Sequence, residues 1–201
     1  DEISTAPIEY NDIAIFNPQR GMASFLIPAI LILIIQQSLL LCVGLLAGTS
    51  RENNQFKDLV PIHRKYRGTL RIVMGKSLAY ISIYSLLVAY VLIITPKIFN
   101  LIQLASFGTL AAFILPYMLS CIFFAMTVSI FMRNRESCLL IVVFTSVPLL
   151  FISGISWPRS NEPIFWKILS YIFPSTFGIN GFIRINSMGA LLKDVEPEFR
   201  M

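Results

Sequence analysis

A few residues of this chain have the types and spacing that nucleotide binding, metal binding or catalysis would need. Gly75-Lys76-Ser77 matches the end of a phosphate-binding loop, but that motif needs a glycine at the position of Leu70. His63 is the only histidine, so it cannot build a zinc site by itself. Neither an H-E-x-x-H nor a G-x-S-x-G motif occurs. We therefore expect no catalytic, cofactor-binding or metal-binding residues, and we do not expect an enzyme.

Polar side chains interrupt the apolar runs of the chain at a few positions. Gln36 and Gln37 lie in the middle of one such run, and an amide in hydrocarbon needs a hydrogen-bond partner. These side chains either bond to a neighbouring helix or line a transport path, and helix packing is the competing interpretation at each position. The candidate pathway residues are Gln36, Gln37, Ser120, Thr127 and Thr145.

The elements that hold these residues are predicted to be membrane spans. Of the 201 residues, 56% are hydrophobic and 13% are charged, and the mean hydropathy is +0.73. A soluble domain is about 25% charged, so this much apolar surface needs a bilayer to cover it. Because about 20 helical residues cross a hydrocarbon core of about 30 Å, we expect spans at about residues 22–47, 77–95, 105–131 and 138–155. The predicted fold is an all-α membrane protein, with residues 1–201 in a single transmembrane domain.

The chain changes character after the fourth predicted span. Residues 163–173 are apolar and aromatic but too few to cross a bilayer, which indicates an interfacial or re-entrant helix. Pro174-Ser175-Thr176 is expected to break that helix, and residues 177–201 are mixed in character. This region is therefore predicted to lie at a membrane surface rather than to span the membrane.

Basic residues gather between the first two predicted spans. Residues 51–76 contain seven basic and two acidic side chains, and the turn at 132–137 adds two arginines, whereas the loop at 96–103 has one lysine. The positive-inside rule places the two basic loops in the cytoplasm and both ends of the chain outside. Since the basic residues of this chain, with its net charge of +5, mark the ends of spans rather than a groove, we expect no nucleic-acid partner.

The same basic segment, residues 51–76, shows the spacing of short amphipathic helices. A short apolar stripe precedes Pro61, and arginines then recur at helical intervals at Arg64, Arg67 and Arg71. Such a helix lies along the membrane surface, where anionic lipid can hold it or a soluble partner can dock on it. The composition leaves both interpretations open.

Several short motifs follow one another along the chain in a defined order. They are Asn17-Pro18, FLIPA at 25–29, Arg51-Glu52, Leu59-Val60-Pro61, Gly75-Lys76, Ser153-Gly154, Trp157-Pro158 and Phe173-Pro174-Ser175-Thr176. This order resembles the C-terminal part of the permease of ABC type-2 transporters, a family of bacterial multidrug and polymer exporters. The chain departs from the family's pattern at Ala29, where glycine is usual, and at Gln55-Phe56, where Gly-Thr is usual.

The resemblance implies an ATP-driven exporter in which this chain spans the membrane and a separate subunit hydrolyses ATP. Two permease subunits, identical or different, would form the pathway in a bacterial inner membrane, surrounded by lipid, and a periplasmic adaptor is a further candidate partner. Residues 51–76 would form an amphipathic coupling helix that docks the ATPase through Arg51, Glu52, Phe56, Leu59, Val60, Pro61 and Arg64. Residues 156–176 would form an extracytoplasmic re-entrant hairpin, marked by Ser153, Gly154, Pro158 and Pro174.

The beginning of the chain suggests a piece of a longer protein. It starts with Asp1 and an acidic stretch, the opposite of the basic start of a signal peptide. The resemblance implies one span upstream of these residues and a final span downstream, and the chain includes neither. We therefore expect a fragment of the membrane domain.

Two other classes of function compete with the exporter. A secondary carrier or channel would carry ionisable groups inside its spans or show inverted repeats, and the predicted spans contain no charged residue. A membrane-embedded scaffold subunit would need no ATPase. An ATP-binding protein that purifies with this one would favour the exporter over both.

Overall fold

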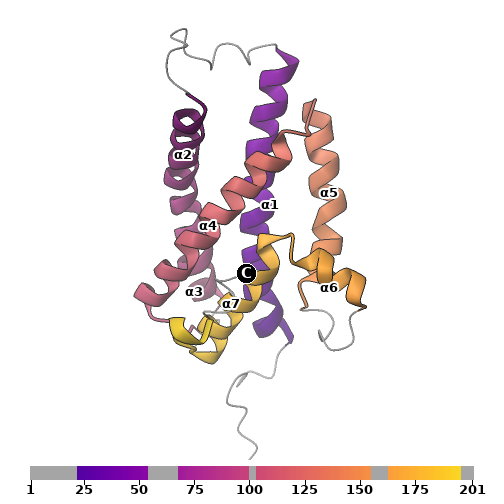
Figure 1. The fold of residues 1–201 in the computed structure, drawn as a ribbon. Helices are drawn as coiled ribbons and strands as arrows, with labels where there is room; N and C mark the ends of the chain where they lie inside the picture. The colour runs from indigo at the N-terminus through magenta and orange to yellow at the C-terminus, as the bar shows by residue number, and fades with distance from the viewer. Residues whose placement is uncertain (1–21, 54–67, 100–102, 155–162, 196–201) are drawn as a thin grey trace, which may run out of the picture.

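The structure is a computed structural model that describes residues 22–53, 68–99, 103–154 and 163–195, and the regular structure in these ranges is helical (Figure 1). In chain order the elements are α1 (Met22–Glu52), α2 (Thr69–Ala89), the π-helix η3 (Tyr90–Ile94), α3 (Thr95–Ile98), α4 (Phe107–Ser129), α5 (Arg135–Ile152), α6 (Ile164–Ser170), α7 (Pro174–Met188) and the short 3-10 helix η5 (Leu192–Val195). The stretches long and apolar enough to cross a membrane are Leu26–Glu52, Leu70–Ile98, Phe107–Ser129 and Arg135–Ile152. The predicted all-α membrane protein with four spans is therefore confirmed over the described ranges.

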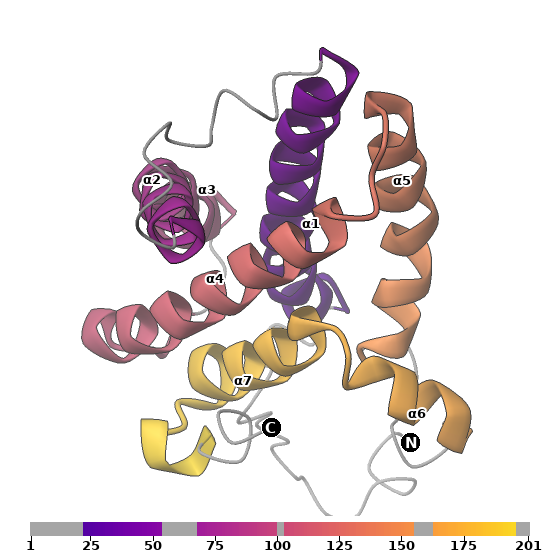
Figure 2. The ribbon, with the colours of Figure 1, turned by 45° about the horizontal axis from the view of Figure 1, so that its top comes forward.

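Helix α1 forms the centre of the molecule. Helices α4, α5 and α7 pack against it, as Figures 1 and 2 show from two directions. Ile32, Ile35 and Leu39 of α1 are fully buried and recur at helical spacing. In the apolar window of α1, 56% of the residues are buried, against 22% in α2 and 17% in α5. Helices α2 and α5 therefore leave most of their apolar surface uncovered by the other described helices.

Helix α2 contacts the rest of the molecule along one narrow stripe. Its buried side chains follow one another every three or four residues through η3 and α3: Ser77, Tyr80, Tyr84, Val88, Leu92 and Pro96. A step of four residues overshoots an α-helical turn by about 40°, so an unbroken α-helix would wind this stripe away from the core. The π-helix η3 places more residues in each turn and so keeps Leu92 and Pro96 on the buried face.

Two glycines of α1 allow the turn between α4 and α5 to approach closely. A Cβ on Gly48 would lie 3.0 Å from the backbone nitrogen of Arg135 and 3.0 Å from the carbonyl carbon of Asn134. A Cβ on Gly44 would clash with the sulfur atoms of Cys138 and Met132. Small residues four positions apart commonly bring membrane helices into backbone contact, and here they set the spacing between α1 and the start of α5.

Helix α7 is buried against α1 and α4. Its two glycines face aromatic rings of α4: Gly178 lies against Tyr117, and a Cβ on Gly181 would lie 2.5 Å from the ring of Phe113. Helix α6 shows the opposite pattern, because Ser170 is its buried residue and most of its apolar side chains are exposed. The segment from Pro163 to Met188 is thus an exposed short helix followed by a buried longer one.

The observed helix boundaries differ from the predicted span boundaries. The predicted second span, residues 77–95, is too short, because the helix runs from Thr69 through η3 and α3 to Ile98. Leu70 and Met74 continue the apolar pattern of α2, so the backbone has no reason to leave the helix before Ser77. Residues 69–76 were expected to belong to the surface segment, and they form the first two turns of α2. Helix α1 likewise continues past 47 to Glu52.

Pro174-Ser175-Thr176 follows the end of one helix, as expected, and also begins another, because α6 ends at Ser170 and α7 starts at Pro174. Proline is favoured in the first turn of a helix, where its missing N–H costs nothing. Helix α7 ends at Gly189, whose φ of 65° is the left-handed conformation that glycine adopts easily at a helix end. The proline therefore starts α7, and residues 177–188, which are mixed in composition, are helical.

Candidate functional site

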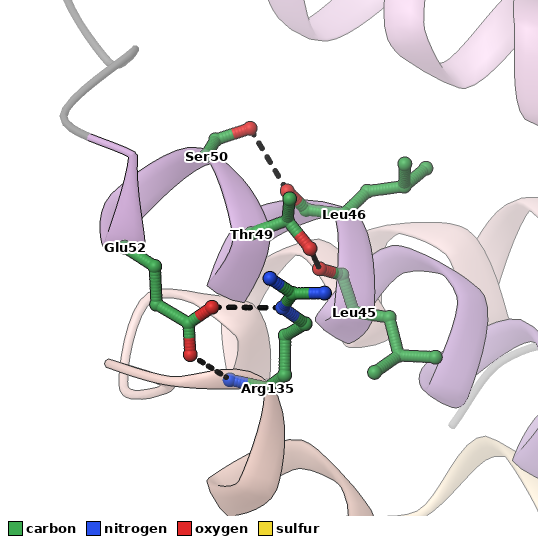
Figure 3. Close-up of polar contacts among 6 residues, drawn as sticks. All are labelled: Leu45, Leu46, Thr49, Ser50, Glu52 and Arg135. Carbon is green, nitrogen blue, oxygen red and sulfur yellow. Dashed lines mark hydrogen bonds and ion pairs between the residues drawn. The ribbon is translucent and has the colours of Figure 1, made fainter.

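The end of α1 is held to the turn between α4 and α5 by polar contacts of Arg51 and Glu52. The Arg51 Nη1 atom donates a hydrogen bond of 2.7 Å to the carbonyl oxygen of Met132. Glu52 Oε2 accepts from Arg135 Nε at 2.7 Å, and Glu52 Oε1 accepts from the backbone N–H of Arg135 at 3.1 Å (Figure 3). We call these contacts the α1 clamp.

The local sequence explains why the α1 clamp forms. Arg135 is the first residue of α5, and the N-cap residue, Asn134, makes no side-chain capping bond. The carboxylate of Glu52 takes over that role, since it binds a backbone N–H at the positive end of the α5 dipole. The hydroxyls of Thr49 and Ser50 bond back to the carbonyls of Leu45 and Leu46, both at 2.8 Å (Figure 3).

The α1 clamp lies at the end of the molecule where the segment between α1 and α2 is attached. Figure 1 shows the end of α1, the start of α2 and the turn between α4 and α5 at this same end, opposite α3 and α7. The basic residues described at this end are Arg51, Arg71, Lys76, Arg133 and Arg135. Basic side chains at one end of a helical membrane bundle, of which Arg71, Arg133 and Arg135 are exposed here, suit contact with lipid headgroups or with a soluble partner.

The predicted coupling residues divide into two groups. Arg51 and Glu52 lie within the described chain and contact the turn between α4 and α5. Phe56, Leu59, Val60, Pro61 and Arg64 lie outside the described residues. The amphipathic coupling helix predicted for residues 51–76 therefore remains a prediction for its central part.

The structure does not bring the five candidate pathway residues together. Gln36 and Gln37 are buried in the middle of α1. Ser120 and Thr127 lie on the exposed face of α4, and Thr127 bonds to the carbonyl of Phe123 in its own helix. Thr145 on α5 also bonds within its helix, to the carbonyl of Ile141 at 2.6 Å. The described helices thus place these residues on three separate surfaces.

The two glutamines of α1 combine deep burial with incomplete hydrogen bonding. Gln36 is 1% exposed, and its Oε1 atom lies 3.9 Å from the thiol of Cys121 on α4. Within the described residues, the side-chain nitrogen of Gln36 and both polar side-chain atoms of Gln37 have no hydrogen-bond partner. Buried amides of this kind bind water or a polar group of another molecule when one is present.

Two hydroxyls of α7, those of Ser175 and Thr176, are buried as well, and the sequence pointed to them only as part of the Pro174-Ser175-Thr176 motif. Helix α7 runs along α4 so that Gly181, Gly178 and Phe173 meet Phe113, Tyr117 and Phe124 in turn. This register places Ser175 and Thr176 near the level of Cys121, and both hydroxyls are buried without a partner among the described residues. The sequence signal that would have placed both hydroxyls in the first turn of a helix is Pro174, because proline is favoured at a helix start.

The predicted hairpin residues that the structure describes lie at helix ends. Ser153 is fully buried at the end of α5, and its hydroxyl donates to the carbonyl of Leu150 at 2.7 Å. Gly154 follows with a φ of 80°, which stops the helix, and Pro174 starts α7. Pro158 lies outside the described residues. A re-entrant path for residues 156–176 remains a prediction.

The arrangement of the helices defines the class of protein. Four apolar, span-length helices, with α1 as the most buried of them, make it an integral membrane protein. The family described as "ABC-2 family transporter protein" matches residues 1–195, so the chain belongs to this family and is a transmembrane permease of an ABC transporter. The resemblance inferred from the short motifs is thereby confirmed. Comparisons with curated proteins and with solved structures gave no match.

Proposed function

We propose that this permease is the membrane subunit of an ATP-driven exporter and that a separate ATPase drives it from the cytoplasm. The observation that carries the proposal is the family match over residues 1–195, because permeases of this family in general work with an ABC ATPase subunit. In this proposal the chain hydrolyses no ATP itself. Two copies, or this chain and a related one, enclose the pathway in a bacterial inner membrane.

The proposed docking site lies within the segment at 51–76, at the end of the molecule that carries the α1 clamp. Two structural features support this position. Five described basic residues lie at this end, Arg51, Arg71, Lys76, Arg133 and Arg135, and the positive-inside rule assigns such an end to the cytoplasm. The segment also joins the central helix α1 to α2, so a partner bound to it can act on both helices.

ATP can drive the permease only if the ATPase binds one permease conformation better than another. A docking segment attached directly to two membrane helices meets this requirement, because a shift of the segment changes the positions of the two helix ends. At the opposite end of the molecule, α6 and the start of α7 belong to the segment that we propose as the extracytoplasmic hairpin. Gln36 and Gln37 are the proposed pathway residues that best fit polar cargo, because their buried amides have unused hydrogen-bonding capacity.

The first test is recovery of an ATP-binding protein with the full-length protein from native membranes. Wild type is compared with Leu59→Asp, which places a charge in the apolar stripe of the proposed docking segment. We expect wild type to recover the ATPase and Leu59→Asp to reduce recovery about tenfold or more, since a charge in an apolar contact typically costs over 1.4 kcal/mol.

The matched control for this pull-down is Leu191→Asp. Leu191 is 66% exposed and follows α7, so the same substitution there tests the other end of the molecule. Recovery from Leu191→Asp should equal that from wild type. If wild type recovers no ATP-binding protein, the exporter proposal is wrong and a carrier or scaffold becomes the better interpretation. Equal recovery from Leu59→Asp and wild type would move the docking site elsewhere.

A further inference from the structure

The segment between α1 and α2 is attached to two helices that differ in how firmly they are held. The end of α1 makes three hydrogen bonds to residues that are 81 to 83 positions away in the sequence. The start of α2 is more open: Leu70 is 74% exposed and Met74 is 61% exposed. A Cβ added to Gly75 would meet nothing within 4 Å.

We propose that Arg51 and Glu52 are positioning residues that make the end of α1 and the turn between α4 and α5 move as one unit. The proposal rests on the proposed function and concerns how the ATPase acts on the permease. In it, Arg51 and Glu52 do not provide the docking surface. They pass a displacement of the docking segment to α4 and α5, while α2 moves relative to that unit.

The geometry supports a rigid connection at this place. Arg51 binds a backbone carbonyl and Glu52 binds a backbone N–H, so two of the three bonds end on the main chain of the turn. Gly48, one turn before Glu52, brings the same main chain to within van der Waals contact of α1. With backbone atoms on one side and no Cβ on the other, little room remains for the two elements to slide.

Docking of the ATPase and positioning of the turn are two different roles, and they predict different effects of losing Glu52. If Glu52 touched the ATPase, its loss would weaken assembly of the complex, as Leu59→Asp is expected to do. If Glu52 positions the turn, its loss leaves assembly intact and weakens the link between nucleotide binding and helix movement. The distance between the end of α1 and the turn is therefore the decisive quantity.

The experiment measures distances between spin labels by pulsed electron paramagnetic resonance in the purified permease–ATPase complex. One pair of labels, at Asn53→Cys and Arg133→Cys, reports on the α1 clamp. The other pair, at Leu70→Cys and Arg133→Cys, reports on α2, and all three positions are exposed. A sample with only the native cysteines, Cys42, Cys121 and Cys138, gives the background.

The complex is measured without nucleotide and with a non-hydrolysable ATP analogue. We expect the 53–133 distance to be the same in both states and the 70–133 distance to change. A change in the 53–133 distance on adding the analogue would overturn the proposal, and so would a 70–133 distance that does not respond. Failure to recover any ATPase with wild type would instead count against the proposed function.

Substitution of Glu52 gives a second readout, and Glu136→Gln is its matched control. Glu136 is also exposed and acidic and lies one residue after Arg135, but it is not part of the α1 clamp. Glu52→Gln should keep ATPase recovery at the wild-type level, broaden the 53–133 distance distribution and lower permease-dependent ATP hydrolysis about two- to fivefold, the scale of one exposed ion pair. Glu136→Gln should change none of the three.

A charge exchange between Glu52 and Arg135 distinguishes loss of the ion pair from misfolding of the variant. Glu52→Arg alone should show a larger loss than Glu52→Gln, because it places two arginines side by side. The double variant Glu52→Arg/Arg135→Glu restores the ion pair and should recover part of the hydrolysis. If Glu52→Gln loses the ATPase as completely as Leu59→Asp, Glu52 is a docking residue and the proposal is wrong. Unchanged hydrolysis in Glu52→Gln would also refute it.

Discussion

Gly48 shows how a single missing side chain sets the distance between two membrane helices. The atoms that a Cβ would meet belong to the main chain of Asn134 and Arg135, which cannot rotate away. Gly44, one turn earlier, meets the side chains of Met132 and Cys138. Small residues in α1 thus bring the turn between α4 and α5 close enough for Arg51 and Glu52 to reach it.

We predict that Gly48→Ala destabilises the protein, whereas Gly75→Ala does not. The new methyl group at Gly48 must push backbone atoms that lie 3.0 Å away, and overpacking of this kind typically costs about 1–3 kcal/mol. A methyl group at Gly75 meets nothing within 4 Å, and alanine is favoured over glycine inside a helix by about 0.5–1 kcal/mol.

The two glycine variants are compared by thermal unfolding in the same detergent. Gly48→Ala should lower the midpoint temperature, and Gly75→Ala should leave it unchanged or raise it. Equal midpoints for Gly48→Ala and wild type would show that the turn moves away at little cost, which would also weaken the argument for a rigid α1 clamp.

The element formed by α2, η3 and α3 depends on a polar contact from outside itself. In η3 the backbone N–H of Thr95 bonds to the carbonyl of Tyr90, five residues earlier, so the regular α-helical ladder is interrupted. The side chain of Gln103, which precedes α4, donates a hydrogen bond of 2.7 Å to the carbonyl of Leu92. Gln103 therefore stabilises the π-helix that keeps the buried stripe of α2 on one face.

We predict that Gln103→Met loosens the C-terminal end of the second span, formed by η3 and α3. Methionine has nearly the same size but cannot donate, so the buried carbonyl of Leu92 loses a partner, at a cost of about 1–3 kcal/mol. Amide hydrogen exchange in residues 90–98 should become about tenfold faster or more. Ser82→Ala is the control, because the Ser82 hydroxyl donates to the carbonyl of Leu78 one turn earlier in the same helix, away from η3.

Exchange rates in residues 90–98 that match those of wild type in Gln103→Met would contradict this role for Gln103. The π-helix would then depend on the packing of Leu92 and Pro96, both of which are buried. Faster exchange in Ser82→Ala as well would indicate a general loosening of α2 rather than a local effect at η3.

For the whole molecule, the distribution of charge predicts the orientation in the membrane. The end that carries the α1 clamp has five described basic residues, and the proposed orientation places it in the cytoplasm. A cysteine at Asn53 should then react with a membrane-impermeant maleimide only in inside-out vesicles. A cysteine at Leu191, at the other end of the molecule, should react only in right-side-out vesicles.

The labelling experiment has an internal control in the native thiols. Cys121 and Cys138 are buried and Cys42 is partly buried, so the unsubstituted chain should react slowly from either side. Reaction of both new cysteines from the same side would contradict a path that crosses the membrane three times between Asn53 and Leu191, through α2, α4 and α5. Reaction of each from the opposite side would invert the proposed orientation and exclude residues 51–76 as a cytoplasmic docking site.

The sequence by itself was enough to predict the membrane class, the four spans and the family. Long apolar runs such as that of α1 require a bilayer wherever they pack, and short motifs such as Arg51-Glu52 identify a family without any knowledge of their contacts. The exact helix ends were less predictable. Arg71 and Lys76 suggested a surface segment, yet a helix can carry basic residues in its first turns when these lie at the membrane surface.

Only the tertiary structure decided what the polar residues of the site contact. Glu52 meets Arg135 across 83 residues of sequence, and Gln36 lies beside Cys121 across 85. Such pairs depend on how helices pack, and the packing depends on close contacts such as Gly48 with the turn or Gly178 with Tyr117. Residue type shows that an arginine or a glutamine needs a partner, but it does not say which helix provides one.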